Sequence, residues 1–248
     1  MRQTNPGVGG EKRTESEVST VPVSEIFFSL QGEGVHAGTP SVFLRTFYCN
    51  LTCSWCDTKY TWLDQDRASP GIDYHIISGQ DIFNKIVSYP CKHLVITGGE
   101  PLRHQRRLTP ILSRLRDLGF FVEVETNGTL APITDFLNYV DCFNVSPKIS
   151  NSHVDRVVRL RPDSLRAFVA SHKAWFKFVI VEEADLGEVE EIISVGDIPK
   201  ARVLLMPEGT ELEVLRSRGQ WLAEVCKERG YRFCPRLHIM LFGNQRGT

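Results

Sequence analysis

Short apolar runs alternate with amphipathic stretches along most of this chain, and this alternation restricts the possible folds more than any other feature. Six runs have the length of buried strands: residues 41–46, 93–97, 120–125, 142–146, 175–181 and 202–206. Helical spacing of apolar residues covers 79–88, 109–118 and 211–229, and residues 151–171 are interpreted as mostly helical. The repeated strand-helix order predicts an α/β fold whose parallel sheet is open or curled into a barrel.

Size and charge exclude several classes of protein. The 248 residues suffice for one large domain or two small ones, and a net charge of -1 gives no overall attraction to nucleic acid or to an anionic membrane. No segment is apolar over the roughly 20 residues that a membrane helix needs. We expect residues 1–20 to be a disordered leader and residues 21–248 to form a single domain. The expected compartment is the cytoplasm, where the seven cysteines stay reduced.

Three cysteines lie within eight residues, at Cys49, Cys53 and Cys56, in a segment that follows a predicted strand. Three thiolates on one loop can hold a small centre of soft metal ions. A four-iron, four-sulfur cluster held by three thiolates leaves one iron open, and the amino and carboxylate groups of S-adenosylmethionine (SAM) fit such a vacancy. We therefore expect a [4Fe-4S] cluster with an open iron.

Other interpretations of the triplet stay open at this point. A structural zinc site needs four protein ligands, and no second cysteine pair of matching spacing follows. A redox pair of Cys53 and Cys56 would leave Cys49 unexplained. The remaining cysteines are scattered singly and are interpreted as core thiols: Cys91, Cys142, Cys226 and Cys234.

Polar and glycine-rich segments follow four of the predicted strands. In α/β folds the reactive groups lie at the carboxyl ends of the strands. We therefore expect four segments to converge on one face: Cys49, Gly98-Gly99-Glu100, Thr126-Asn127 and Ser146-Pro147-Lys148. Glycines at 98 and 99 would let the backbone approach a ligand, although such a pair alone also fits a tight turn.

The CxxxCxxC pattern and the later GGEP motif at residues 98–101 resemble the radical SAM superfamily. Further motifs resemble the 7-carboxy-7-deazaguanine synthase family within it. These are residues 28–34 (FSLQGEG), Arg45, Cys56-Asp57-Thr58, residues 125–128 (ETNG), Ser146-Pro147-Lys148 and the tail around His238. The resemblance covers nearly the whole chain after Val23. It implies an incomplete β/α barrel of the radical SAM type.

This resemblance implies conversion of 6-carboxy-5,6,7,8-tetrahydropterin to 7-carboxy-7-deazaguanine with loss of ammonia, a carbon-nitrogen lyase reaction in queuosine and deazapurine biosynthesis. The implied cofactors are the [4Fe-4S] cluster, recycled SAM and Mg²⁺. One electron from a donor such as flavodoxin or ferredoxin would cleave SAM, and the resulting radical would take a hydrogen from the substrate. The family resemblance also suggests a homodimer.

Site residues follow from the same resemblance. The implied metal ligands are Cys49, Cys53 and Cys56 for the cluster and Thr58 for Mg²⁺. The implied SAM contacts are Trp55, Cys56, Asp57, Gly98, Gly99, Glu100, Thr126, Asn127, Ser146, Pro147 and Lys148. The implied substrate contacts are Leu30, Gln31, Gly32, Arg45, Thr97 and His238.

Plainer interpretations exist for several of these residues. Gln31 fits a turn, Arg45 fits an ion pair with an acid such as Glu125, and Thr58 and Lys148 fit an exposed surface. His238 lies in an apolar run, where a histidine is usually a core residue. The role of a terminal carboxylate is not transferred to this chain, which continues through residues 243–248.

A basic cluster opens a predicted helix, and we interpret it as solvated surface: Arg103, His104, Arg106 and Arg107. Two other functions stay open. One is an activase that installs a radical on a glycyl-radical partner, and the other is a binding module held together by zinc.

Overall fold

The computed structural model describes residues 19–62 and 74–248, and the nine strands in these residues form one sheet of order β3-β1-β2-β4-β5-β6-β7-β8-β9. All neighbours from β2 onward are parallel, whereas β1 pairs antiparallel with both β2 and β3. The strands are β1 (Thr20–Leu30), β2 (Pro40–Thr46), β3 (His75–Ser78), β4 (His93–Gly98), β5 (Phe121–Thr126), β6 (Cys142–Val145), β7 (Ala174–Ile180), β8 (Val203–Pro207) and β9 (Arg232–Phe233).

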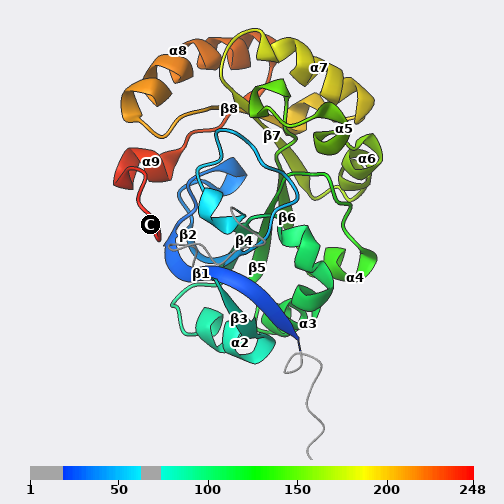
Figure 1. The fold of residues 1–248 in the computed structure, drawn as a ribbon, viewed down its shortest axis with the longest axis vertical. Helices are drawn as coiled ribbons and strands as arrows, with labels where there is room; N and C mark the ends of the chain where they lie inside the picture. The colour runs from blue at the N-terminus through cyan, green and yellow to red at the C-terminus, as the bar shows by residue number, and fades with distance from the viewer. Residues whose placement is uncertain (1–18, 63–73) are drawn as a thin grey trace, which may run out of the picture.

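Helices surround the sheet on its outer side, and the segment after β2 crosses the inside (Figure 1). The α-helices are α2 (Gly79–Val87), α3 (Gln105–Asp117), α4 (Thr134–Leu137), α5 (Arg156–Arg159), α6 (Pro162–Ala170), α7 (Asp185–Val195), α8 (Leu212–Arg229) and α9 (Leu237–Phe242). The 3-10 turns are η1 (Gly34–His36), η2 (Lys59–Thr61), η3 (Pro101–His104), η4 (Ser150–Ser152) and η5 (Lys200–Arg202). None of the described helices combines the length and the apolar character needed to span a membrane.

The predicted incomplete barrel is confirmed, because the parallel sheet curls but β3 and β9 remain separate edges within the described chain. All six predicted strands are present, and none of their ends moves by more than one residue. Strands β1, β3 and β9 and helices α4, α7 and α9 were not predicted. Residues 151–171 are helical in α6 and in the single turn α5, with extended backbone before Pro162. Thr20 already belongs to β1, and residues 1–18, which hold most of the expected leader, lie outside the described residues.

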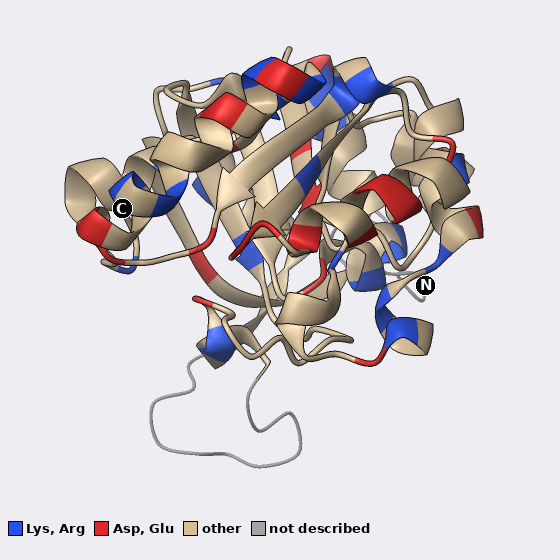
Figure 2. Cartoon of the chain, turned by 90° about the horizontal axis from the view of Figure 1, so that it is seen from above, with Lys and Arg blue, Asp and Glu red and all other residues tan. Residues whose placement is uncertain are grey.

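The two faces of the sheet differ in polarity because side chains alternate along each strand. On β5, Val122 and Val124 belong to the apolar core, so Glu123 and Glu125 face the inside. On β6 and β7 the corresponding inward residues are Asn144 and Lys177. Charged residues therefore occupy the strands as well as the outer helices (Figure 2). The core fills the space between the sheet and the helices, and the inner face is left for a polar site.

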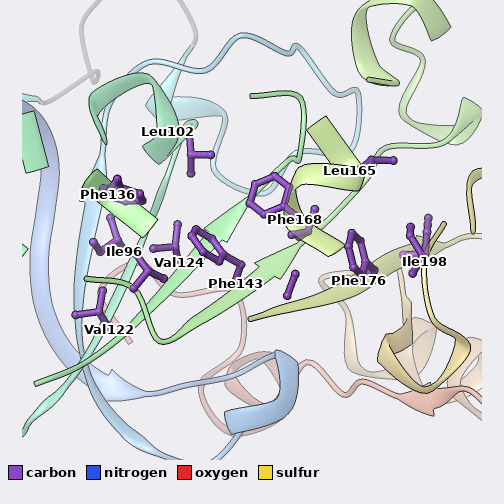
Figure 3. Close-up of a cluster of buried hydrophobic side chains, with 14 of the residues drawn as sticks. Ile96, Leu102, Val122, Val124, Phe136, Phe143, Leu165, Phe168, Phe176 and Ile198 are labelled. Carbon is purple, nitrogen blue, oxygen red and sulfur yellow. The ribbon is translucent and has the colours of Figure 1, made fainter. Parts of the chain in front are cut away.

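Phenylalanine and aliphatic side chains pack together in the core (Figure 3). Phe143 is fully buried on β6, with its ring centroid 5.2 Å from that of Phe168 on α6 and 6.5 Å from that of Phe136 on α4. Aromatic pairs at such separations add attraction beyond the area they bury. Phe143 thus links α4 and α6 to β6.

Two predictions about surface and core residues need correction. His104 is buried rather than solvated, and its Nε2 lies 2.7 Å from the backbone oxygen of Phe47, so only the arginines of the basic cluster are exposed. Burial lowers the pKa of His104. Cys91 is half-buried at the edge of the core, where its thiol donates to the carbonyl of Pro40 at 2.9 Å. The other three scattered cysteines are buried, as predicted.

Replacing Phe143 by alanine should lower the free energy of unfolding by about 3–5 kcal/mol, because the cavity left between α4 and α6 cannot fully collapse. Denaturant unfolding of both proteins measures this difference. Val157→Ala is the control, since Val157 is 75% exposed and should change stability by less than about 0.5 kcal/mol. Equal effects of the two substitutions would contradict the assignment of this core.

Candidate active site

A cavity of about 320 Å³ opens on the inner face of the sheet at the carboxyl ends of the parallel strands. The segments expected to converge do meet here. Of the implied site residues, those lining the cavity are Gln31, Gly32, Arg45, Cys49, Cys53, Trp55, Cys56, Asp57, Thr58, Thr97, Gly98, Gly99, Thr126, Asn127, Ser146, Lys148 and His238. Three implied residues do not line it: Leu30, Glu100 and Pro147.

The cysteine loop follows β2 directly and forms one end of the cavity. Polar hydrogens surround its sulfur atoms. The indole nitrogen of Trp62 lies 3.3 Å from Cys56 Sγ, and the backbone nitrogen of Leu51 lies 3.4 Å from Cys49 Sγ. These N–H groups would stabilise the negative charge that the sulfur atoms carry when they bind a metal.

The chemistry of these thiols fits a metal centre better than a redox pair. Burial raises the pKa of Cys49 to about 12 and also raises the pKa of Cys53. Reactive disulfide-forming cysteines need a lowered thiol pKa, whereas metal coordination itself removes the proton. Within the described residues no fourth cysteine lines the cavity, so the donor set suits a cluster with an open iron better than a four-cysteine zinc site.

Gly98 and Gly99 are required by packing within the protein. A Cβ atom on Gly98, whose φ is +123°, would lie 2.1 Å from the carbonyl oxygen of Thr46. A Cβ atom on Gly99 would lie 2.3 Å from the carbonyl oxygen of Tyr48. From the sequence we expect these glycines to let the backbone approach a ligand. In the structure they let the Gly98-Gly99 turn pack against the backbone that leads into the cysteine loop.

Glu100 supports the site from behind. Its fully buried carboxylate accepts hydrogen bonds from the backbone nitrogen of Leu102 at 2.9 Å, the hydroxyl of Thr126 at 2.8 Å and the backbone nitrogen of Asn127 at 2.8 Å. These bonds join the carboxyl ends of β4 and β5. Glu100 therefore fixes the position of two cavity residues without lining the cavity itself.

Lys148, Ser146 and Trp55 form one part of the cavity lining next to the cysteine loop, here called the Lys148 wall. Lys148 Nζ donates to Ser146 Oγ at 2.8 Å and lies 5.3 Å from the ring centroid of Trp55. All three side chains line the cavity. A held ammonium group and a hydroxyl next to the loop provide suitable partners for a carboxylate ligand.

Arg45 also lines the cavity and is held by an acidic side chain. Its Nε donates to Glu25 Oε1 at 2.6 Å, so the expected acid partner is Glu25 rather than Glu125. Glu25 also accepts from the hydroxyl of Tyr60 at 3.1 Å and pairs with Arg246 at 3.1 Å. In the described part of the chain the terminal nitrogens of Arg45 make no hydrogen bond and can bind a carboxylate.

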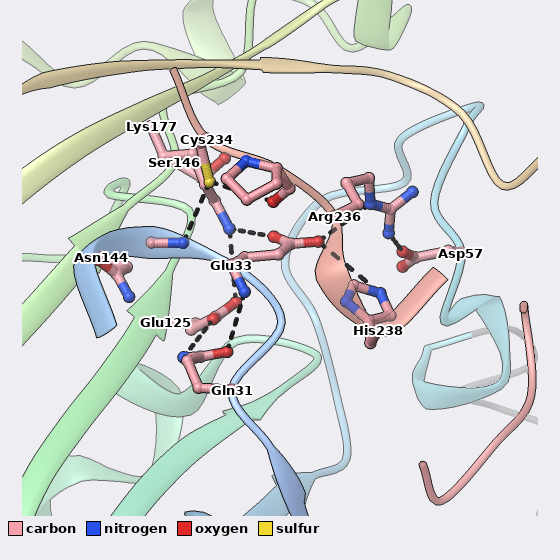
Figure 4. Close-up of polar contacts among 12 residues, drawn as sticks. Gln31, Glu33, Asp57, Glu125, Asn144, Ser146, Lys177, Cys234, Arg236 and His238 are labelled. Carbon is pink, nitrogen blue, oxygen red and sulfur yellow. Dashed lines mark hydrogen bonds and ion pairs between the residues drawn. The ribbon is translucent and has the colours of Figure 1, made fainter. Parts of the chain in front are cut away.

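A buried charged network in the cavity wall was not predicted (Figure 4). Glu33 forms ion pairs with Lys177 and, at 3.0 Å, with Arg236, which also pairs with Asp57 of the cysteine loop. Lys177 also lies 3.7 Å from Glu125. The network joins the segment after β1, strands β5 and β7, the cysteine loop and the tail. The alternation of residues 122–125 (VEVE) was the signal that could have shown Glu123 and Glu125 facing inward, and Glu125 belongs to this network.

The titration behaviour of the network follows its charges. Burial alone would raise the pKa of Glu33, but Lys177 and Arg236 outweigh burial and hold this pKa well below its usual range. Burial raises the pKa of Glu125. Lys177 opposes this shift, whereas the negative charge of the neighbouring Glu33 adds to it. The charged network therefore combines the carboxylate of Glu33, which stays charged, with that of Glu125, which protonates more readily.

His238 lies in the cavity wall and not in the apolar core. Its Nε2 is 4.0 Å from Glu33 Oε1, and burial lowers its pKa. A Cβ atom on Gly32 would lie 2.0 Å from His238 Nδ1, which explains the glycine in the QGEG segment. The backbone nitrogen of Leu237 donates to the carbonyl of Gly32 at 2.8 Å, so the tail is fastened to the end of β1. Further tail residues line the cavity: Asn244, Gln245, Arg246 and Thr248.

Comparison with known proteins agrees with this geometry. Residues 43–181 match the family model of the Radical SAM superfamily. The chain is 41% identical to 7-carboxy-7-deazaguanine synthase of Pyrobaculum aerophilum over 235 residues, covering 94% of this chain and 99% of the relative. It is 37% identical to the enzyme of that name from Halobacterium salinarum, covering 92% and 93%.

Solved structures show the same fold. Similarity to QueE from Escherichia coli has a TM-score of 0.70 at 25% identity and covers 90% of this chain and 97% of that one. SuiB of Streptococcus suis, at a TM-score of 0.53 and 15% identity, shares the fold alone. The cysteine loop, the cavity and the full-length similarity lead to one conclusion: the chain belongs to the 7-carboxy-7-deazaguanine synthase family of the radical SAM superfamily.

Proposed function

We propose that this protein converts 6-carboxy-5,6,7,8-tetrahydropterin to 7-carboxy-7-deazaguanine with loss of ammonia, as a carbon-nitrogen lyase of queuosine and deazapurine biosynthesis. The observation that carries the proposal is that one cavity holds the cysteine loop, the Lys148 wall and the guanidinium of Arg45. The similarity to relatives of this name over more than nine-tenths of both chains supports it.

Each part of the cavity has a separate task in this proposal. The cysteines would hold a [4Fe-4S] cluster and SAM, which together supply a carbon radical able to take hydrogen from a C–H bond. Lys148 and Ser146 would hold the SAM carboxylate beside the loop, and Arg45 would hold the substrate carboxylate with its terminal nitrogens. Fixing both ends brings the reacting carbons together and keeps water out.

Further parts of the proposal concern metal, assembly and location. Thr58 offers a hard oxygen ligand for Mg²⁺ at the cavity wall, two residues after Cys56. A one-electron donor of the flavodoxin or ferredoxin type and a homodimeric state are proposed from the family resemblance. The cytoplasmic location is proposed from the thiols: Cys53, Cys56 and the four scattered cysteines are free, which suits a reducing compartment.

Anaerobic reconstitution with iron and sulfide should load about four irons per chain, together with a brown chromophore. Cys49→Ala, Cys53→Ala and Cys56→Ala should each lose both, because three thiolates are the minimum set on this loop. Iron counting and the visible spectrum measure the outcome, and Cys226→Ala is the control. Stoichiometric zinc with no iron uptake by the intact protein would favour the zinc-held binding module.

Thr58→Ala should lower turnover and weaken its dependence on Mg²⁺ by roughly 10-fold or more, since even groups around a metal ligand often contribute that much. A magnesium titration of the cluster-loaded enzyme tests this. Thr58→Ser keeps the hydroxyl and should behave like the unchanged protein. An identical titration for Thr58→Ala would remove this residue from the site.

Arg45→Ala should reduce kcat/KM for the carboxypterin by at least ~10-fold, or ~1.4 kcal/mol, because the substrate carboxylate loses its cation. SAM cleavage without substrate should continue, since the cysteine loop and the Lys148 wall are unchanged. Arg116→Ala, which removes a surface pair with Asp141, is the control. If the unchanged protein ignores the carboxypterin and instead installs a radical on a partner polypeptide, the activase function is correct.

A further inference from the structure

Glu123 lies beneath the cavity on the inner face of β5, fully buried and not among the lining residues. Its Oε2 is 2.6 Å from His36 Nδ1 and 3.2 Å from His93 Nε2. Its Oε1 accepts from two amide groups, Gln31 Nε2 at 2.6 Å and the Nδ2 of Asn144. Two imidazoles and two amides therefore converge on one carboxylate.

The carboxylate is held in its charged form. Burial alone would raise the pKa of Glu123, but its hydrogen bonds to His36 and His93 lower this pKa to about 2. The donor atoms of these three residues lie within 4.8 Å of one another, a grouping that also occurs in metal sites. Here the imidazole nitrogens already bond to the carboxylate, so the group is satisfied without a cation.

An ionised carboxylate only accepts hydrogen bonds, so any amide that contacts it must present its NH₂ end. Gln31 uses both amide hydrogens in this way, toward Glu123 and, at 3.2 Å, toward Glu125 Oε1. Its carbonyl oxygen accepts one long bond from the backbone nitrogen of Glu33 at 3.3 Å. Gln31 can therefore offer a ligand only an acceptor.

Asn144 is oriented by the same oxygen of Glu123. Because its NH₂ end faces the carboxylate, its Oδ1 is directed away from it. This oxygen is buried and has no hydrogen-bond partner within the described residues, although Asn144 lines the cavity (Figure 4). Buried acceptors rarely stay unpaired, and an unpaired one beside a cavity indicates a ligand or a water that donates to it.

We propose that Glu123 is a positioning residue that sets the orientation of both amides, so that Gln31 and Asn144 together recognise a ligand edge rich in N–H donors. This identification of the ligand rests on the proposed function: the edge is the pyrimidinone edge of the carboxypterin, which carries the 2-amino group and the neighbouring ring N–H. Buried acceptors reject an analogue that lacks the matching donor, because they are then left unpaired. Glu123 thus determines specificity without touching the substrate.

The test compares two ligands with the anaerobic, cluster-loaded enzyme in the presence of SAM. One is the carboxypterin, and the other is its analogue with hydrogen in place of the 2-amino group. The unchanged protein should bind the carboxypterin at least about 10-fold more tightly than the analogue. Glu123→Gln removes the charge that obliges Asn144 to present its NH₂ end, while Gln31 keeps its bond to Glu125, and should reduce this preference to less than about 3-fold.

Two further variants separate this role from stability. Asn144→Ala removes the unpaired acceptor while Glu123 stays charged, and it should also reduce the preference. Glu188→Gln neutralises a carboxylate that pairs with the buried Arg159 at 2.6 Å away from the cavity, and it should leave the preference unchanged. A variant that only loosens the fold would weaken both ligands alike and would not change their ratio.

The outcomes are distinguishable. An unchanged preference in both Glu123→Gln and Asn144→Ala would overturn the role of Glu123 while leaving the proposed function intact. A protein that binds neither ligand would overturn the proposed substrate, and this inference with it. A reduced preference in both variants, with normal iron content and uncoupled SAM cleavage, supports the proposal.

Discussion

The burial of charge on the inner face of the sheet is the constraint on which the rest of the structure depends. Glu33, Lys177 and Arg236 lie almost out of contact with water, and each would be very costly there without its partner. Their pairing requires β1, β7 and the tail to meet at one place. The apolar core fixes the strands, but this network determines which loops close over the carboxyl ends of those strands.

The same network links the cysteine loop to the segment after β1 and to the tail. Asp57 follows the last cysteine directly and pairs with Arg236, which is also bound to Glu33 at the end of β1. A charged bond of this kind positions a loop more firmly than backbone contacts alone, since breaking it would leave a buried charge unpaired. The cysteine loop and the segment after β1 are thereby held together through one buried arginine.

Much of the fold could be predicted because its signals are local. The buried strands are apolar runs in the sequence, and the cysteine spacing can be recognised without any structure. Gly119 and Gly230, which have positive φ, mark the ends of two helices. Strand β3 could not be predicted, since its four residues are half-exposed and gain their order only from pairing with β1. His104 was misplaced because its charged neighbours indicate surface, whereas its ring is buried against the carbonyl of Phe47.

The sequence by itself determined the α/β class, the cysteine loop and the groups that end each parallel strand, because these depend on residue type and on spacing along the chain. Only the tertiary structure decided the pairing of Arg45 with Glu25, the place of His238 in the cavity wall and the contacts of Glu123. Those contacts join residues far apart in the chain, such as Gln31 with Glu123. Their formation depends on strand order and on side-chain direction, which no local pattern encodes.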